Sequence, residues 1–142
     1  MKTGFTLMVV ALFFFALVGC KTAVVPGATV SKGMVTFSAD GTSAVSADGD
    51  ALAVAKAQVA AATLAKANLL EKIKGARVNN EVRVADLLFK SEAARTAVTG
   101  WLSRATLTPG ETSRISEATM ITCTATLSIT TKELKSLSKY VE

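Results

Sequence analysis

Residues 50–74 contain the longest regular pattern in the chain, an almost unbroken run of Ala, Leu and Val with Lys spaced along it. Alanine has the highest helix propensity of all residues, so this composition predicts a long helix. Asp48 or Asp50 suits its N-cap, and Gly75 stands where a helix of this length would end. The larger apolar residues fall on one side, which we expect to face the core: Leu52, Val59, Leu69, Leu70 and Ile73.

The remaining surface of this helix consists of small side chains rather than charged ones. A surface helix ordinarily carries charged residues on its outer side. Two interpretations stay open: a plain Ala-rich core helix, or a helix placed between its own sheet and a second subunit. For the second interpretation the candidate contacts on the helix are Ala57, Ala61 and Leu64.

The clearest alternation of apolar and polar residues in the chain lies within about residues 115–130 and predicts a strand. One face consists of Ile121, Cys123, Ala125, Leu127 and Ile129, so we expect Cys123 to be a small buried hydrophobic residue. The other face is rich in uncharged, β-prone threonine. It is either plain solvent surface or a subunit contact, with Thr122, Thr124 and Thr126 as the candidates.

Weaker patterns complete the expected order of elements. They predict a strand at 77–84, a helix at 86–103 whose true start could be Ser91, a strand at 105–108 before a Pro-Gly turn, and a terminal helix at 131–141 capped by Thr131. The Asp-Gly pairs at 40–41 and 48–49 predict turns. Together these elements predict an α+β fold in which one long Ala-rich helix and a second helix pack on a small, mostly antiparallel sheet.

The N-terminus has the anatomy of a secretory signal, with Lys2 before an apolar run over residues 7–17. The run ends in Leu-Val-Gly-Cys at 17–20, which resembles a bacterial lipobox. This resemblance implies that residues 1–19 are removed and that Cys20 is acylated (palmitate) and anchors the chain in a membrane. By the same resemblance, Lys21 in place of Asp after the cysteine means that no signal retains the protein in the inner membrane, so we expect the outer membrane. We therefore expect a lipidated N-terminus and tether over residues 20–37 and a single domain over residues 38–142.

Composition narrows the classes of function. The chain has no His, which removes His-based catalysis and His metal ligands. It contains no Gly-rich phosphate loop and no metal-ligand spacing. The mature chain keeps 15 basic and 11 acidic residues and has no run of five or more basic residues, so a nucleic-acid partner is not expected. We expect no enzyme activity, no cofactor and no metal.

The lipobox, the short linker and the Ala/Lys helix, with Ala-Lys pairs at 55–56 and 65–66, are followed by a late Thr-rich strand. This combination resembles the FlgP-type flagellar assembly lipoproteins over about residues 50–135. The resemblance implies a homo-oligomeric ring or disc subunit on the periplasmic side of the outer membrane. It also implies contacts with other flagellar basal-body ring proteins and a requirement in motility. The alternative is a non-flagellar outer-membrane module that binds the cell wall or a surface partner.

Overall fold

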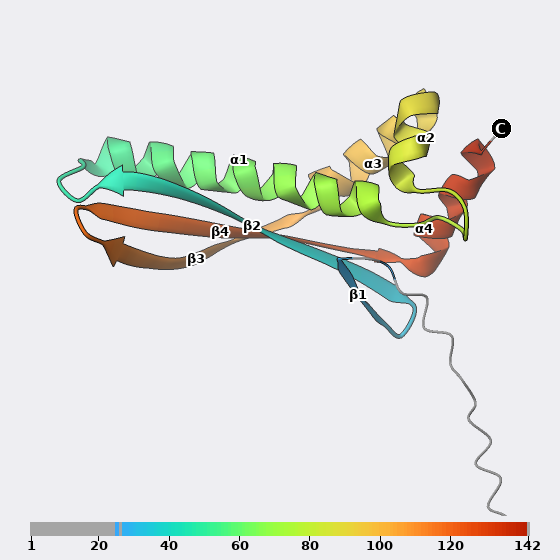
Figure 1. Cartoon of the computed structure of the whole chain (residues 1–142), viewed down its shortest axis with the longest axis horizontal. Helices are drawn as coiled ribbons and strands as arrows, with labels where there is room; N and C mark the ends of the chain where they lie inside the picture. Colours follow the sequence, from blue (N-terminus) through green and yellow to red (C-terminus); the bar gives the residue numbers. More distant parts are fainter. Residues whose placement is uncertain (1–24, 26, 142) are drawn as a thin grey trace, which may run out of the picture.

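The computed structural model describes residues 25 and 27–141, which form an α+β fold as the sequence predicts. A four-stranded antiparallel sheet carries one long helix and several short ones at one end (Figure 1). The elements in chain order are β1 (Ala28–Ser31), β2 (Met34–Ser46), α1 (Ala51–Gly75), α2 (Val84–Lys90), α3 (Glu92–Ser103), β3 (Thr106–Ile115), β4 (Ala118–Thr130) and α4 (Thr131–Ser136), with a 3₁₀ turn at Leu137–Tyr140.

The strand order in the sheet is β1-β2-β4-β3. The two central strands pair along their whole 13-residue length, from Met34 opposite Thr130 to Ser46 opposite Ala118. At about 3.3 Å per residue each is about 43 Å long, and the 25-residue helix α1 at about 1.5 Å per residue is nearly as long. The result is an elongated two-layer molecule in which α1 lies along one face of the sheet (Figure 1).

Helix α1 approaches β2 unusually closely at Gly41. A Cβ atom at this position would overlap the Ala61 carbonyl oxygen and the Ala65 amide nitrogen, and would lie 2.9 Å from the Ala65 Cα. One turn further along, the Asn68 side-chain amide donates to the Asp40 carbonyl oxygen at 2.7 Å. A glycine inside a strand often marks such a close backbone approach. The predicted Asp-Gly turn at 40–41 is therefore wrong: these residues lie in the middle of β2, whereas the pair at 48–49 does form a turn.

This close approach selects the side of α1 that is buried. The buried residues follow at intervals of four: Ala57, Ala61, Ala65, Leu69 and Ile73. A row of residues at this interval winds slowly around a helix, so it can follow the twist of the sheet. The predicted core side is wrong over its first half, because Leu52 is 61% exposed and Val59 is 67% exposed. Only small side chains fit where the helix backbone meets the Gly41 backbone.

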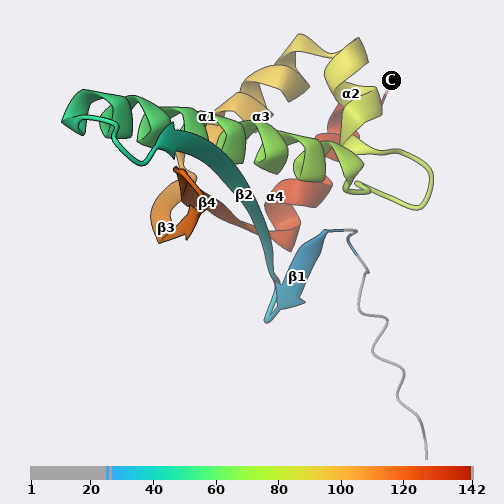
Figure 2. The same cartoon turned by 60° about the vertical axis from the view of Figure 1, so that its left-hand side comes forward.

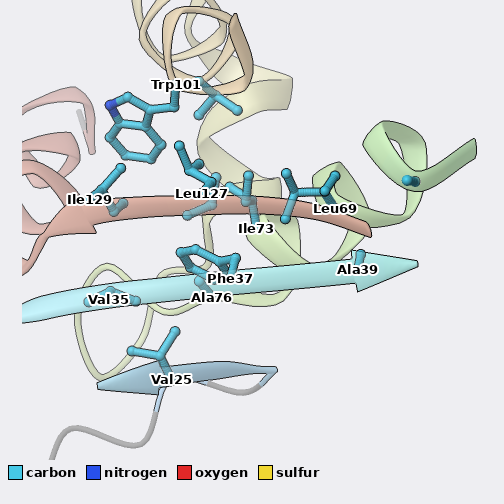
Figure 3. Packing of buried hydrophobic residues seen from close by; sticks show 14 of the residues in the cluster. Val25, Val35, Phe37, Ala39, Leu69, Ile73, Ala76, Trp101, Leu127 and Ile129 are labelled. Atoms are coloured by element: carbon cyan, nitrogen blue, oxygen red, sulfur yellow. The ribbon is translucent and has the colours of Figure 1, made fainter. Parts of the chain in front are cut away.

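Larger side chains fill the core beyond this contact, toward the C-terminal half of α1. Phe37 from β2, Leu69 and Ile73 from α1 and Leu127 from β4 meet there, and Trp101 of α3 points down beside Ile129 (Figure 3). Phe37, Leu69 and Ile73 are fully buried. Among the described residues every buried side chain is apolar. The small-residue contact and this cluster together hold α1 on the sheet.

The domain begins earlier than predicted. Residues 28–31 form β1 and residues 34–37 form the start of β2, so the expected tether up to residue 37 is too long. Lys32 and Gly33 make the turn between them with positive φ angles of 47° and 78°, as a tight hairpin turn requires. Val35 is 1% exposed, which shows that this segment belongs to the core.

The middle of the chain also differs from its prediction. Residues 77–83 form a loop with a single bridge between Arg77 and Arg83, instead of a strand. The Asn79 side-chain oxygen accepts from the amides of residues 81 and 82, and this local turn competes with strand pairing. The single helix predicted at 86–103 is two helices, because the Ser91 hydroxyl caps α3 by accepting from the Ala94 amide.

The C-terminal part agrees with the sequence more closely. The apolar face of β4 is buried as predicted, and Cys123 is 7% exposed. Ser116 has a φ of 55° and ends β3, so β4 begins at 118 rather than 115, and β3 extends to 115 instead of ending at 108. The predicted terminal helix divides into α4 and the 3₁₀ turn, and its N-cap is Thr130, one residue before the predicted Thr131.

Candidate interaction site: the groove between helix α1 and strand β3

A groove of about 540 Å³ lies between the N-terminal half of α1 and the edge of the sheet. Helix α1 packs mainly on the central strands β2 and β4, while β3 lies beyond β4 on the side away from β2 (Figure 2). The helix is centred over Gly41 of β2, so it does not cover β3. The groove is lined by Ala55, Gln58, Val59, Ala62, Leu107, Pro109, Gly110, Thr112, Ile121, Thr122 and Cys123.

The groove has an apolar floor and apolar walls. Ile121 and Cys123 of β4 are 5% and 7% exposed, and they line it from the sheet. Val59, which projects from α1, leaves two thirds of its surface in solvent. Leu107 and Pro109 line it from β3. An exposed valine beside a partly covered core is apolar surface that a partner could bury.

Strand β3 forms one edge of the sheet. Within the described part of the chain it pairs with β4 on one side and with no strand on the other. The register shifts between Pro109 and Thr112, and a Cβ at Gly110 would lie 3.1 Å from Thr122. A proline and a bulge both discourage the addition of another strand. The groove beside this edge is therefore better suited to receive side chains than to extend the sheet.

Of the interface residues predicted on α1, only Leu64 lies at the surface, at 44% exposed. Ala57 is 6% exposed and Ala61 is fully buried, both against their own sheet. This part of the prediction is corrected, because the small side chains serve the contact with Gly41 inside the domain. Val59, which we expected in the core, takes their place at the surface. The proline inside the β3 sequence was the one local sign of an edge strand here.

The predicted threonines Thr122, Thr124 and Thr126 alternate with the buried residues of β4 and therefore lie on the sheet face opposite α1, and Thr122 also borders the groove. On the face opposite α1, the Thr124 hydroxyl donates to an Asp40 carboxylate oxygen at 2.6 Å. On the same face, the Thr36 and Ser128 hydroxyls are hydrogen-bonded at 2.9 Å. These bonds join β2 to β4 across an open face that carries few charges.

Glu133, at the start of α4 and away from the groove, is a titratable group with a shifted pKa. The Thr130 backbone amide donates to the Glu133 carboxylate at 2.7 Å, and Arg104 contacts the other carboxylate oxygen at 2.9 Å. Two hydrogen bonds lower the pKa of Glu133: the larger effect comes from the Thr130 backbone amide and the next from Arg104. This carboxylate forms the capping box of α4, so its shifted pKa has a structural explanation.

Within residues 25 and 27–141 no group of three acidic or Cys side chains is placed to hold a metal ion. In the same range no helix is both long and apolar enough to cross a membrane. Cys20 and the expected signal peptide lie outside the described residues. No family model, no curated protein and no solved structure matches the chain.

Proposed function

We propose that this protein is a lipid-anchored structural subunit that assembles with copies of itself on the outer membrane. The observation that carries the proposal is the apolar groove between α1 and β3, with Val59 67% exposed at its wall. A second copy that inserted apolar side chains here would bury Val59 and cover Ile121 and Cys123. The exposed apolar residues on the same molecule, such as Ile115 at 60%, can supply such side chains.

Membrane attachment would allow weak contacts of this kind to hold an assembly together. Acylation at Cys20 would confine all copies to one plane and raise their effective concentration. Stable anchoring requires more than one acyl chain, as lipidation of the lipobox type provides. Each subunit then needs only a modest apolar contact with its neighbours.

The resemblance to FlgP-type lipoproteins extends this proposal to a particular assembly. The subunit would form a ring or disc of the flagellar basal body, contact other ring proteins and be needed for motility. Deletion of the gene in a flagellated host should then abolish swimming. Normal swimming of the deletion strain would exclude the flagellar role and leave self-assembly to be tested on its own.

Self-assembly can be tested with two substitutions on one helix. We expect Val59→Arg to prevent assembly by placing a charge in the groove, and Leu52→Arg to have no effect because Leu52 lies outside the groove. Both positions are exposed, at 67% and 61%, so both variants should fold. Analytical ultracentrifugation and electron microscopy of the purified lipoprotein give the readout. A monomeric wild-type protein, or equal assembly of both variants, would refute the groove as a subunit contact.

Anchoring is tested by feeding cells a fatty-acid analogue and isolating the protein. The wild-type protein and the matched Cys123→Ser variant should carry the label, because Cys123 is a buried thiol in the core. The Cys20→Ser variant should carry none. Labelling of Cys20→Ser at the wild-type level would show that the acyl group is attached elsewhere or that the label is not specific.

The second candidate function is an outer-membrane binding module. The groove volume favours it, because 540 Å³ lies within the range of pockets that hold small ligands, about 300–1,000 Å³. A monomer in solution that binds cell-wall fragments, and loses this binding in the Val59→Arg variant, would support the module over the ring subunit.

A further inference from the structure

Strand β1 and helix α4 lie at one end of the molecule (Figure 1), and the segments at this end carry four exposed basic residues. We call Lys32, Arg77, Lys132 and Lys135 the basic cluster. The Gly33 carbonyl accepts from the Thr131 amide at 2.8 Å, which joins the β1–β2 turn to the start of α4. This contact places Lys32 and Lys132 on either side of one junction.

The other two members of the basic cluster line a cleft of about 360 Å³ at the same end of the molecule. Arg77 comes from the loop after α1 and Lys135 from α4, and Asn79, Asn80 and Thr131 add polar groups to the cleft. All four basic residues are exposed, and among the described residues none of them forms an ion pair. The cleft therefore presents unneutralised cations beside hydrogen-bonding groups.

Nearby acidic residues offset this charge only in part. Glu81 lies in the same loop as Arg77, and Glu133 of α4 is already paired with Arg104. The opposite end of the long axis carries more acidic than basic residues, with Asp48 and Asp50 before α1 and Glu117 in the β3–β4 turn against Arg114 near the end of β3. The described domain is thus positive at one end and negative at the other.

The basic end is also the end at which the chain leads toward the proposed anchor. Val25 lines the same cleft as Arg77 and Lys135, and it is only five positions after Cys20 in the sequence. Since each residue spans at most about 3.6 Å, the two Cα atoms can be no more than about 18 Å apart. A lipid at Cys20 would therefore keep the basic cluster close to the membrane surface.

We infer that the basic cluster docks on the headgroups of anionic phospholipids and holds the domain end-on to the membrane. This inference rests on the proposed acylation of Cys20. Phosphate groups would enter the cleft between Arg77 and Lys135, while Lys32 and Lys132 contact neighbouring headgroups. Each basic residue near an anionic surface strengthens binding about fivefold. End-on docking leaves the sides of the molecule, including the α1–β3 groove, directed toward neighbours in the membrane plane.

The test uses the mature lipoprotein in vesicles of neutral phosphatidylcholine, with or without added phosphatidylglycerol. A fluorescent label is attached to Ser138→Cys, in the exposed turn after α4, and its quenching by quencher-labelled headgroups measures the distance of this end from the membrane. The same label on Ser46→Cys measures the distance of the opposite end. We compare the pair Lys132→Gln and Lys135→Gln with the control pair Lys56→Gln and Lys66→Gln on α1. Both pairs remove two positive charges from exposed sites.

We expect strong quenching at Ser138→Cys in anionic vesicles, weak quenching in neutral ones, and little at Ser46→Cys in either. The Lys132/Lys135 pair should lower the ratio of docked to undocked protein about 25-fold, and the control pair should leave it unchanged. Equal quenching in neutral vesicles, or equal effects of both pairs, would overturn the docking. Co-sedimentation with neutral vesicles tests the lipid anchor separately. If the protein does not sediment with neutral vesicles, acylation of Cys20 is refuted. Sedimentation with anionic vesicles then still measures binding by the basic cluster.

Discussion

Replacing Gly41 with alanine tests whether the close contact between β2 and α1 holds the two layers together. The added methyl group would overlap backbone atoms of Ala61 and Ala65. Backbone atoms of a helix cannot rotate away as the tip of a long side chain can. The variant must therefore lift α1 from the sheet, which loosens the packing of Ala57, Ala61 and Ala65 at the same time.

The expected cost is at the upper end of what overpacking causes, about 3 kcal/mol of the free energy of unfolding. The entropy of unfolding of a domain of this size converts 1 kcal/mol into about 4 °C. Gly41→Ala should thus lower the melting temperature by about 12 °C. The additional loss of helix packing would increase this figure.

Thermal and urea unfolding followed by circular dichroism measure the effect, with Gly100→Ala as the control. Gly100 lies inside α3, and a Cβ there would meet no other atom within 4 Å. The control should therefore gain about 0.5–1 kcal/mol from the better helix propensity of alanine. If Gly41→Ala is as stable as the wild-type protein, α1 does not rest on the β2 backbone as described, and the reasoning fails.

Three further predictions concern the core, a helix cap and pH. Phe37→Ala should cost about 3–5 kcal/mol because Phe37 is fully buried, whereas Phe89→Ala should change stability by less than about 0.5 kcal/mol because Phe89 is 92% exposed; urea unfolding of both variants tests this. Ser91→Ala removes the cap of α3 and should cost about 1 kcal/mol in the same assay, and an unchanged midpoint would show that the cap is dispensable. Because the pKa of Glu133 is lowered in the folded state, its ionised carboxylate stabilises the fold at pH values above the ordinary pKa of 4.5. This contribution is lost as the pH falls through the lowered pKa. The wild-type protein should thus lose more stability than Glu133→Gln between about pH 6 and about pH 3, and parallel pH curves would contradict this.

The sequence was most informative where short-range chemistry decides the structure. Asp50 was one of two predicted caps, and its carboxylate accepts from the Ala53 amide at 2.8 Å. The alternation around Cys123 predicted the buried face of β4 correctly, because successive side chains of a strand point to opposite faces. The lipobox at Cys20 remains a prediction from sequence, since it lies outside the described residues.

The candidate site was less accessible from the sequence. Its walls come from α1 and β3, which are separated by thirty residues of the chain. Helical periodicity placed Val59 in the core because it is large and apolar, and placed Ala57 and Ala61 at a subunit contact because they are small. The structure reverses these assignments, and no local pattern on the helix contained the reason.

By itself, the sequence determined the long helix, the buried face of the last strand and the α+β class, and it predicts an anchor at Cys20. These follow from propensity, periodicity and a short motif, all of which act within a few residues. The tertiary structure alone decided which side of α1 is buried, why Gly41 belongs to a strand, and that β3 is left uncovered beside a groove. These depend on the distance between two backbones that meet only after folding, and the close approach at Gly41 sets that distance.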